Sequence, residues 1–175
     1  MLVLADKSEE QNQVVNLTRP AAATDAPLLW KFLAIAAQER EAADAAAIPE
    51  VAKYLKGWMR PGDFGLVATE ADQSLGAAWA RQFSPEERPF VYAGEAIPEL
   101  AIGVIDAARG KGVGSILLDE LILTARLRGC KGLCLNVREN NPAVRLYASR
   151  GFQILHDQTL TNRSSGLSLG MLLSF

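Results

Sequence analysis

The sequence predicts one α/β domain, of the α+β kind, in which a mixed and mostly antiparallel central sheet is flanked by helices. Three observations lead to this fold class. The chain has 175 residues, a length that fits one domain better than two. Segments with strand and helix periodicity alternate along most of it. The early strands pair as a hairpin, which indicates a mixed sheet and not a fully parallel one.

The N-terminal part begins with a polar stretch. Residues 1–13 are polar after the first five, so we expect a flexible tail there and a single domain over 14–175. A β-branched run predicts the first strand at 14–18. Thr24 or Asp25 can cap the helix that follows, because short polar side chains accept hydrogen bonds from first-turn amides.

Apolar spacing, prolines and glycines set the remaining boundaries. Gly129 and Gly151 are expected to end two helices. Three prolines and a glycine make 84–98 a loop, which is a candidate substrate lid carrying Phe90 and Tyr92. In chain order, the expected elements are helices at 25–40 and 49–60, a hairpin at 64–69 and 74–82, a strand at 99–105, a helix at 115–128, a strand at 133–137, a helix at 142–150, and strands at 152–155 and 167–173.

The composition removes several classes of function. Eighteen basic and twenty acidic side chains give a net charge of −2, which argues against a nucleic-acid binder. His156 is the single histidine, and Cys130 and Cys134 are the two cysteines, so no metal site or disulfide framework is expected. No targeting segment or long apolar span is visible, so we expect a cytoplasmic protein without a membrane partner.

A glycine-rich turn between a buried strand and an amphipathic helix is the strongest motif. Gly110, Gly112 and Gly114 leave the backbone bare at alternate positions, so successive amides can converge on one point. The helix that follows adds its own free amides and the positive end of its dipole. Arg109 and Lys111 add positive charge. The turn is therefore suited to a phosphate or pyrophosphate.

Two common phosphate-binding loops do not fit this spacing. A Walker A loop needs Ser or Thr after its Gly-Lys pair, but Gly112 follows Lys111. A dinucleotide fingerprint starting at Gly110 or Gly112 would place its third glycine at Ser115 or Leu117. A nucleotide-phosphate binder of another fold is therefore disfavoured.

The spacing that does match resembles a known family. Arg109, Gly112 and Gly114 fill the pattern [RQ]-x-x-G-x-[GA], which resembles the acetyl-CoA loop of the GNAT superfamily of N-acetyltransferases. A second segment, after the strand at 133–137, resembles the family pattern N-x-x-A-x-x-[LF]-Y-x-x-x-G-F. Its matching residues are Asn140, Ala143, Leu146, Tyr147, Gly151 and Phe152.

The resemblance implies a set of residues that bind acetyl-CoA. The backbone of Ile102, Gly103 and Val104 would face the pantetheine arm, and Asn140 would contact the cofactor. Gly103 has an alternative role as a packing glycine. Asn140 could instead cap a helix, although Asn141 is also available. The pyrophosphate would lie on the amides of Arg109, Gly110, Lys111, Gly112, Val113 and Gly114.

The resemblance also implies acid and base groups. Tyr147 would lie near the cofactor sulfur and protonate the departing thiolate, unless it is only a core tyrosine. Glu99 is the first candidate for the base that takes the proton of the amine, and Glu95 is the second. Glu99 could instead be a surface charge at a strand end, and some members of the family need only water.

We therefore expect an N-acetyltransferase that moves an acetyl group from acetyl-CoA to a primary amine by direct attack in a ternary complex, without a metal. The alternative is a non-catalytic acyl-CoA-binding or regulatory module, which would need neither Tyr147 nor Glu99. A homodimer is compatible with the resemblance, because the C-terminal strands often pair in this family. The sequence leaves the identity of the amine open.

Overall fold

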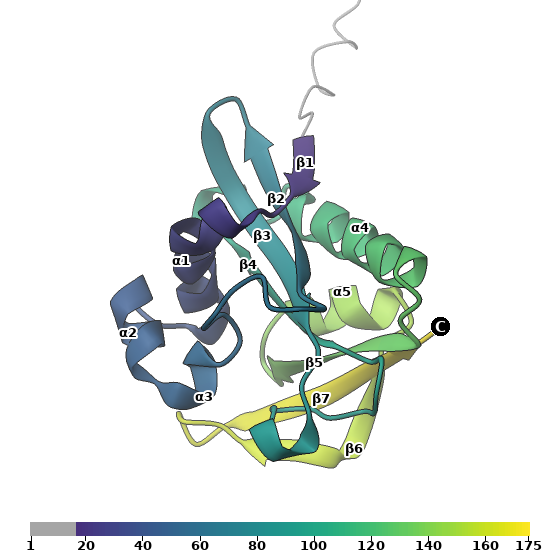
Figure 1. Cartoon of the computed structure of the whole chain (residues 1–175). Coiled ribbons are helices and arrows are strands. Elements are labelled where there is room, and N and C mark those ends of the chain that lie inside the picture. Colours follow the sequence, from purple (N-terminus) through teal and green to yellow (C-terminus); the bar gives the residue numbers. More distant parts are fainter. Residues whose placement is uncertain (1–16) are drawn as a thin grey trace, which may run out of the picture.

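The computed structural model describes residues 17–175 and shows a seven-stranded sheet with helices on both faces (Figure 1). The strand order is β1-β2-β3-β4-β5-β7-β6, and every neighbouring pair is antiparallel except β4 and β5. The mixed, mostly antiparallel sheet is thus confirmed. The strands are β1 (Leu17–Pro20), β2 (Phe64–Glu70), β3 (Gln73–Arg81), β4 (Glu99–Val104), β5 (Gly132–Arg138), β6 (Gln153–Thr161) and β7 (Leu167–Ser174).

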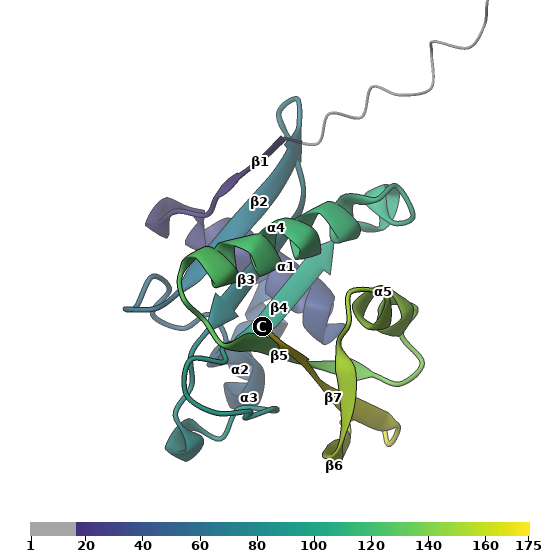
Figure 2. The ribbon, with the colours of Figure 1, turned by 90° about the vertical axis from the view of Figure 1, so that its right-hand side faces the viewer.

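The helices cover the two faces of the sheet separately (Figure 2). One buried cluster packs α4 and α5 on one face, and a second packs α1, α2 and α3 on the other. No helix of residues 17–175 is long and apolar enough to span a bilayer. The helices are α1 (Ala26–Ala37), α2 (Ala42–Ala47), α3 (Pro49–Ala52), α4 (Val113–Leu127) and α5 (Ala143–Ser149).

The predicted N-terminal elements are only partly within the described residues. The tail expected at 1–13 lies outside them, as do the first three residues of the strand expected at 14–18. Asp25 directly precedes α1, but its carboxylate does not cap that helix. It accepts hydrogen bonds from the Ala22 amide and from Arg19 instead, each at 2.7 Å.

The helix expected at 49–60 is wrong beyond its first turn. α3 ends at Ala52, and turns follow it. Gly57 and Met59 have left-handed φ values of 67° and 70°, which a right-handed helix does not allow. The Arg81 guanidinium also holds the turns after α3, because it donates to the carbonyl oxygens of Lys53 and Lys56 at 2.7 and 2.8 Å. A continuing helix would use those carbonyls for its own i→i+4 bonds. The left-handed residues and the Arg81 contact are therefore both incompatible with a helix that continues to 60.

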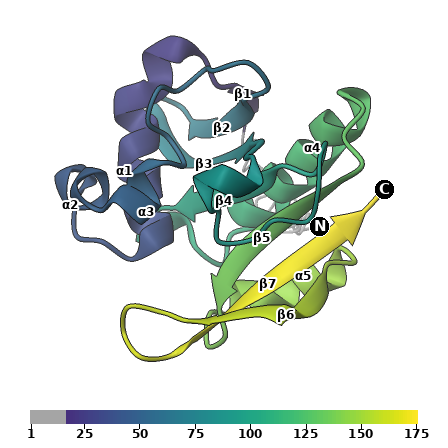
Figure 3. The ribbon, with the colours of Figure 1, turned by 60° about the horizontal axis from the view of Figure 1, so that its bottom comes forward.

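The strand expected at 152–155 is longer than its apolar pattern suggested. β6 continues to Thr161 and pairs with β7 on both sides of an irregularity between Leu155 and Thr159 (Figure 3). β6 is the last strand in the sheet order, and most of its side chains are exposed, so polar residues are tolerated there. His156 lies exposed in this irregular part.

β4 and β5 are paired over a very short length. A single register pair, Glu99 with Cys134, joins the two strands. β4 pairs with β3 along all six of its residues, and β5 pairs with β7 along all seven. The two halves of the sheet therefore diverge after Glu99, and the backbone edge of β4 beyond that residue has no strand beside it.

Candidate active site

A cavity of about 1100 Å³ lies where β4 and β5 diverge. Residues 100–104 of β4 and 135–138 of β5 form its walls, and α1, α3 and α5 contribute side chains. The predicted strand residues Ile102, Gly103 and Val104 all line it. This volume is in the range of pockets that hold a small molecule or cofactor.

Side-chain alternation divides the cavity into two halves. Leu100, Ile102 and Val104 pack on the face covered by α4 and α5. Glu99, Ala101 and Gly103 alternate with them and point toward α1 and α3, where Ala101 packs. An occupant that passes between the strands can therefore meet different residues on the two faces of the sheet.

The glycine-rich turn lies at the α4 side of the cavity. Gly110 and Gly112 have φ values of 73° and 85°, a left-handed conformation that favours glycine. Gly112 immediately precedes α4, so the first-turn amides of that helix are free of intrahelical partners. Arg109, Gly110 and Gly114 line the cavity.

The other residues of the turn lie differently. Lys111 is exposed, and the Val113 side chain is buried in the core beneath α4. Neither of them lines the cavity, nor does Gly112. Arg109 forms an exposed ion pair of 3.2 Å with Asp106. Side chains therefore contribute little to the cavity wall here, which leaves the backbone as the accessible surface of this turn.

Asn140 and Asn141 have separate roles. The Asn141 side-chain oxygen accepts a hydrogen bond of 2.9 Å from the Ala143 amide at the start of α5. Asn140 is exposed and lines the cavity. The capping role considered for Asn140 therefore belongs to Asn141.

Tyr147 lies on α5 and lines the cavity, although its side chain is mostly buried. Its ring packs edge-to-face on Phe152, with 5.8 Å between the ring centroids. Burial raises the pKa of the Tyr147 phenol above its ordinary value, so the group stays protonated at neutral pH. A phenol in this state can donate a proton or a hydrogen bond.

Glu99 is buried, with only 2% of its surface exposed, so the alternative of a surface charge is wrong. Burial raises its pKa to about 8, because a charged carboxylate is poorly solvated there. The Tyr54 hydroxyl donates a hydrogen bond of 2.5 Å to Glu99 Oε2, which opposes that shift. Glu95, the second candidate, is exposed and does not line the cavity.

The sequence matches the Acetyltransferase (GNAT) family over residues 29–152, more than two thirds of the chain. The chain belongs to this family. No curated protein sequence gives a significant match.

Solved structures of GNAT proteins share the fold. A ribosomal-protein-alanine N-acetyltransferase from Brucella melitensis is 27% identical, with a TM-score of 0.69 over 91% of this chain and 99% of the other. The structure of yncA from Salmonella typhimurium, solved with its cofactor acetyl-CoA, is 22% identical, with a TM-score of 0.67 over 90% of this chain and 92% of the other. This chain is thus an acyltransferase of the GNAT type.

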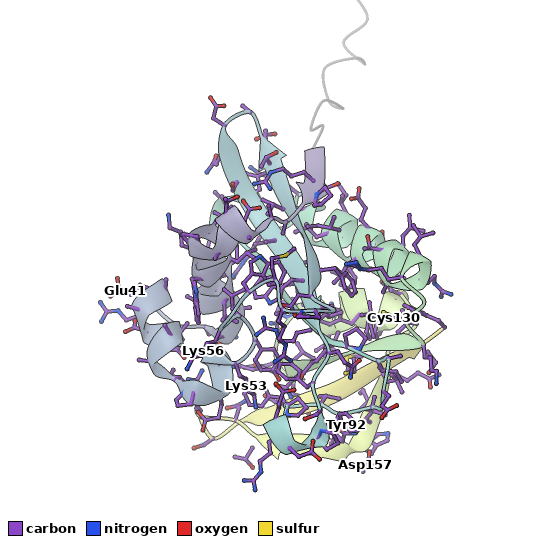
Figure 4. All side chains as sticks on the ribbon, viewed as in Figure 1. Glu41, Lys53, Lys56, Tyr92, Cys130 and Asp157 are labelled. Carbon is purple, nitrogen blue, oxygen red and sulfur yellow. The ribbon has the colours of Figure 1, made fainter. Side chains whose placement is uncertain are left out.

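Sequence reasoning missed the aromatic neighbours of Glu99 in this GNAT domain. Tyr54 and Phe90 line the same cavity, and their rings stack with centroids 5.5 Å apart. The Lys53 ammonium lies 5.3 Å from the Phe90 ring centroid, on the side of the molecule shown in Figure 4. Tyr54 lies within the segment that was expected to be a helix at 49–60, and no spacing in the sequence connects it to Glu99.

Proposed function

We propose that this chain is an acetyl-CoA-dependent N-acetyltransferase that acetylates a primary amine by direct attack in a ternary complex. The observation that carries the proposal is the position of Glu99. A buried carboxyl group with a raised pKa lines the same cavity as Tyr147 and the glycine-rich turn. Perturbed titratable groups in a large cavity are a signature of catalytic sites.

The residues around the cavity fit acetyl-CoA, which would supply the acetyl thioester. The free amides at the start of α4 and the backbone of Gly110 suit its pyrophosphate. The unpaired edge of β4 at Ile102–Val104 offers hydrogen-bonding groups to an amide-containing arm. Asn140 is free to contact the same molecule, because Asn141 is the residue that bonds to α5.

Glu99 and Tyr147 can perform the two proton transfers. Glu99, once ionised, accepts the proton that the amine loses as its nitrogen bonds to the acetyl carbon. Tyr147 donates its proton to sulfur as the carbon–sulfur bond breaks. Glu99 then releases its proton to solvent, and the Tyr147 phenolate takes one up from solvent. A base with a pKa of about 8 is well matched to an ammonium group that must be deprotonated near neutral pH.

The test is release of free coenzyme A from acetyl-CoA in the presence of amines. The panel contains a polyamine, an aminoglycoside, free amino acids and a peptide with an N-terminal alanine. The peptide is included because the 27%-identical Brucella structure is described as a ribosomal-protein-alanine N-acetyltransferase.

Wild-type protein should release coenzyme A with at least one amine, and Glu99→Gln should lose most of that rate. Calorimetry with acetyl-CoA is run in parallel on both proteins. Binding without turnover by any amine would favour a non-catalytic acyl-CoA-binding module. Turnover by Glu99→Gln at the wild-type rate would leave the activity in place and remove Glu99 as the base.

A further inference from the structure

We propose that Tyr54 is a positioning residue that orients Glu99, stabilises its carboxylate and links it to the 84–98 segment. The proposal rests on the function above, in which Glu99 is the base. Tyr54 would not touch the reacting atoms itself. It would act through the hydrogen bond that its hydroxyl makes to Glu99.

The hydrogen bonds of the Tyr54 hydroxyl have a fixed direction. The Phe90 amide lies 2.8 Å from the phenol oxygen and can only donate. The phenol has one proton, and Glu99 Oε2 lies 2.5 Å away. When Glu99 is ionised, the phenol therefore accepts from Phe90 and donates to Glu99. Both side chains are buried, with 5% and 2% of their surfaces exposed, so water cannot readily replace either partner.

The ring and backbone of Tyr54 are held on several sides. Phe83 packs edge-to-face on the ring, with centroids 5.0 Å apart, and Phe90 stacks on the same ring at 5.5 Å. The Trp79 indole donates to the Tyr54 carbonyl at 3.0 Å. Arg81 fixes the carbonyl of the preceding residue, Lys53, at 2.7 Å. The hydroxyl is thus presented to Glu99 with little freedom to move away.

The 84–98 segment connects to Glu99 through the same hydroxyl. Besides the Phe90 bond, the Lys53 ammonium donates to the Arg88 carbonyl. Gln158 of β6 bonds to both the amide and the carbonyl of Tyr92, each at 3.0 Å. The amides of Phe90 and Val91 also favour the ionised form of Glu99. A displacement of this segment would therefore change the proton affinity of the carboxyl group.

The charged and titratable groups facing Glu99 come from three elements. Lys53, after α3, favours the carboxylate. Cys134 of β5 has its pKa raised by burial and by the charge of Glu99, so it remains a neutral thiol. Arg81 of β3 is the register partner of Glu99, but its guanidinium is bound by Asp63. The Tyr54 hydroxyl is the largest of the influences that oppose burial.

The experiment follows the ¹³C resonance of the Glu99 carboxyl group in a pH titration of the whole protein, with Glu99→Gln identifying the resonance. Tyr54→Phe removes the donor and should raise the midpoint by about one to two pH units, the effect of a hydrogen bond to a charged group. The acidic limb of kcat/KM should move by the same amount, while KM for acetyl-CoA is unchanged.

Tyr92→Phe is the matched control, because it removes a phenol from the 84–98 segment without touching Glu99. It should leave the titration midpoint and the pH profile in place. A midpoint in Tyr54→Phe within about 0.3 units of wild type would overturn the proposal. The NMR titration does not depend on turnover, so it tests Tyr54 even if Glu99→Gln shows that Glu99 is not the base.

A second variant covers the case in which Tyr54→Phe fails to fold. Placing 3-fluorotyrosine at position 54 keeps the shape of the side chain and makes its hydroxyl a stronger donor. It should lower the Glu99 midpoint, which is opposite to the effect of Tyr54→Phe. An unchanged or raised midpoint in the folded fluorinated protein would contradict the proposed role.

Discussion

Gly103 lies so close to Phe32 that a Cβ atom on the glycine would overlap the Phe32 carbonyl oxygen. The backbone of α1 therefore packs directly on the backbone of β4. From the sequence, this glycine indicated either a close backbone approach to a cofactor or a packing contact. The close approach that requires glycine here is to α1. The contact also sets the position of α1 along one side of the cavity, which α1 and β4 both line.

Gly103→Ala should destabilise the protein by about 2–3 kcal/mol, because α1 must move to admit the methyl group. Gly114→Ala is the control. Its Cβ would meet Leu146 and Val104 at an ordinary 3.8 Å, and alanine favours the helix. Urea unfolding monitored by circular dichroism compares the two variants. Equal midpoints would show that α1 adjusts freely and that Gly103 is not needed for packing.

Gly112→Asp should lower the affinity for acetyl-CoA by at least about 100-fold, which is about 2.7 kcal/mol. The change places a carboxylate beside the amides proposed to hold the pyrophosphate, and it also strains a residue with φ of 85°. Gly129→Asp is matched for strain, since Gly129 has φ of 77° and open space around it, but it lies at the other end of α4. Calorimetry should show that Gly129→Asp binds acetyl-CoA with the affinity of wild type, whereas Gly112→Asp does not.

Glu99 should make both activity and stability depend on pH. Below about 8, where the carboxyl group is protonated, kcat/KM should rise about tenfold per pH unit and then level off. The unfolded chain releases this proton near the ordinary value of 4.5, so the folded state binds it more tightly between 4.5 and 8. Stability contributed by this group is therefore lost as the pH rises through that window.

Glu99→Gln removes the titration. The free energy of unfolding of the variant minus that of wild type should therefore increase from pH 5 to pH 8.5. The increase should be a few kcal/mol, at about 1.4 kcal/mol per pKa unit. Urea unfolding at the two pH values measures the change. A constant difference between variant and wild type would mean that Glu99 has an ordinary pKa in the folded protein.

The buried pair of Arg81 and Asp63 should be far more important to stability than a surface pair. The two side chains are each 1% exposed and 2.6 Å apart. Arg81→Met leaves the buried Asp63 carboxylate with only the Arg60 amide at 3.1 Å and a long ion pair to Arg60 at 3.9 Å. We therefore expect a loss of about 3–5 kcal/mol, partly recovered by adding Asp63→Leu. Arg150→Met breaks the partly exposed pair with Asp119 and should cost less than about 1 kcal/mol. Similar losses of stability in Arg81→Met and Arg150→Met would contradict the prediction that the buried pair is the more important one.

The features that the sequence could predict are local. The left-handed glycines at 110 and 112 and the helix that begins at Val113 follow from neighbouring residues, and so does the apolar strand before them. The family patterns also lie within short segments. Alternation and capping could place these elements because each depends on interactions within one or two turns of the chain.

The remaining features depend on distant residues. Tyr54 and Glu99 are 45 positions apart, and no periodicity relates them. The turns after α3 are held by Arg81, which lies 25 residues beyond Lys56 and donates to the Lys56 carbonyl. The sequence pattern predicted only the first part of β6. An edge strand buries few side chains, and the alternation of β6 is interrupted after Leu155. Such tertiary contacts shape the part of the cavity around Glu99 and Tyr54, which is where the sequence was least informative.

Tyr147→Phe should lower kcat by about 100-fold, within the usual range for loss of a general acid, and leave KM for acetyl-CoA nearly unchanged. The phenol makes no hydrogen bond to another residue of 17–175, and its ring contact with Phe152 survives the change. The unfolding midpoint should therefore stay the same, which separates a chemical effect from a structural one. Steady-state release of coenzyme A with an accepted amine gives kcat. A rate equal to that of wild type would assign Tyr147 to the core alone and leave protonation of the thiolate to water.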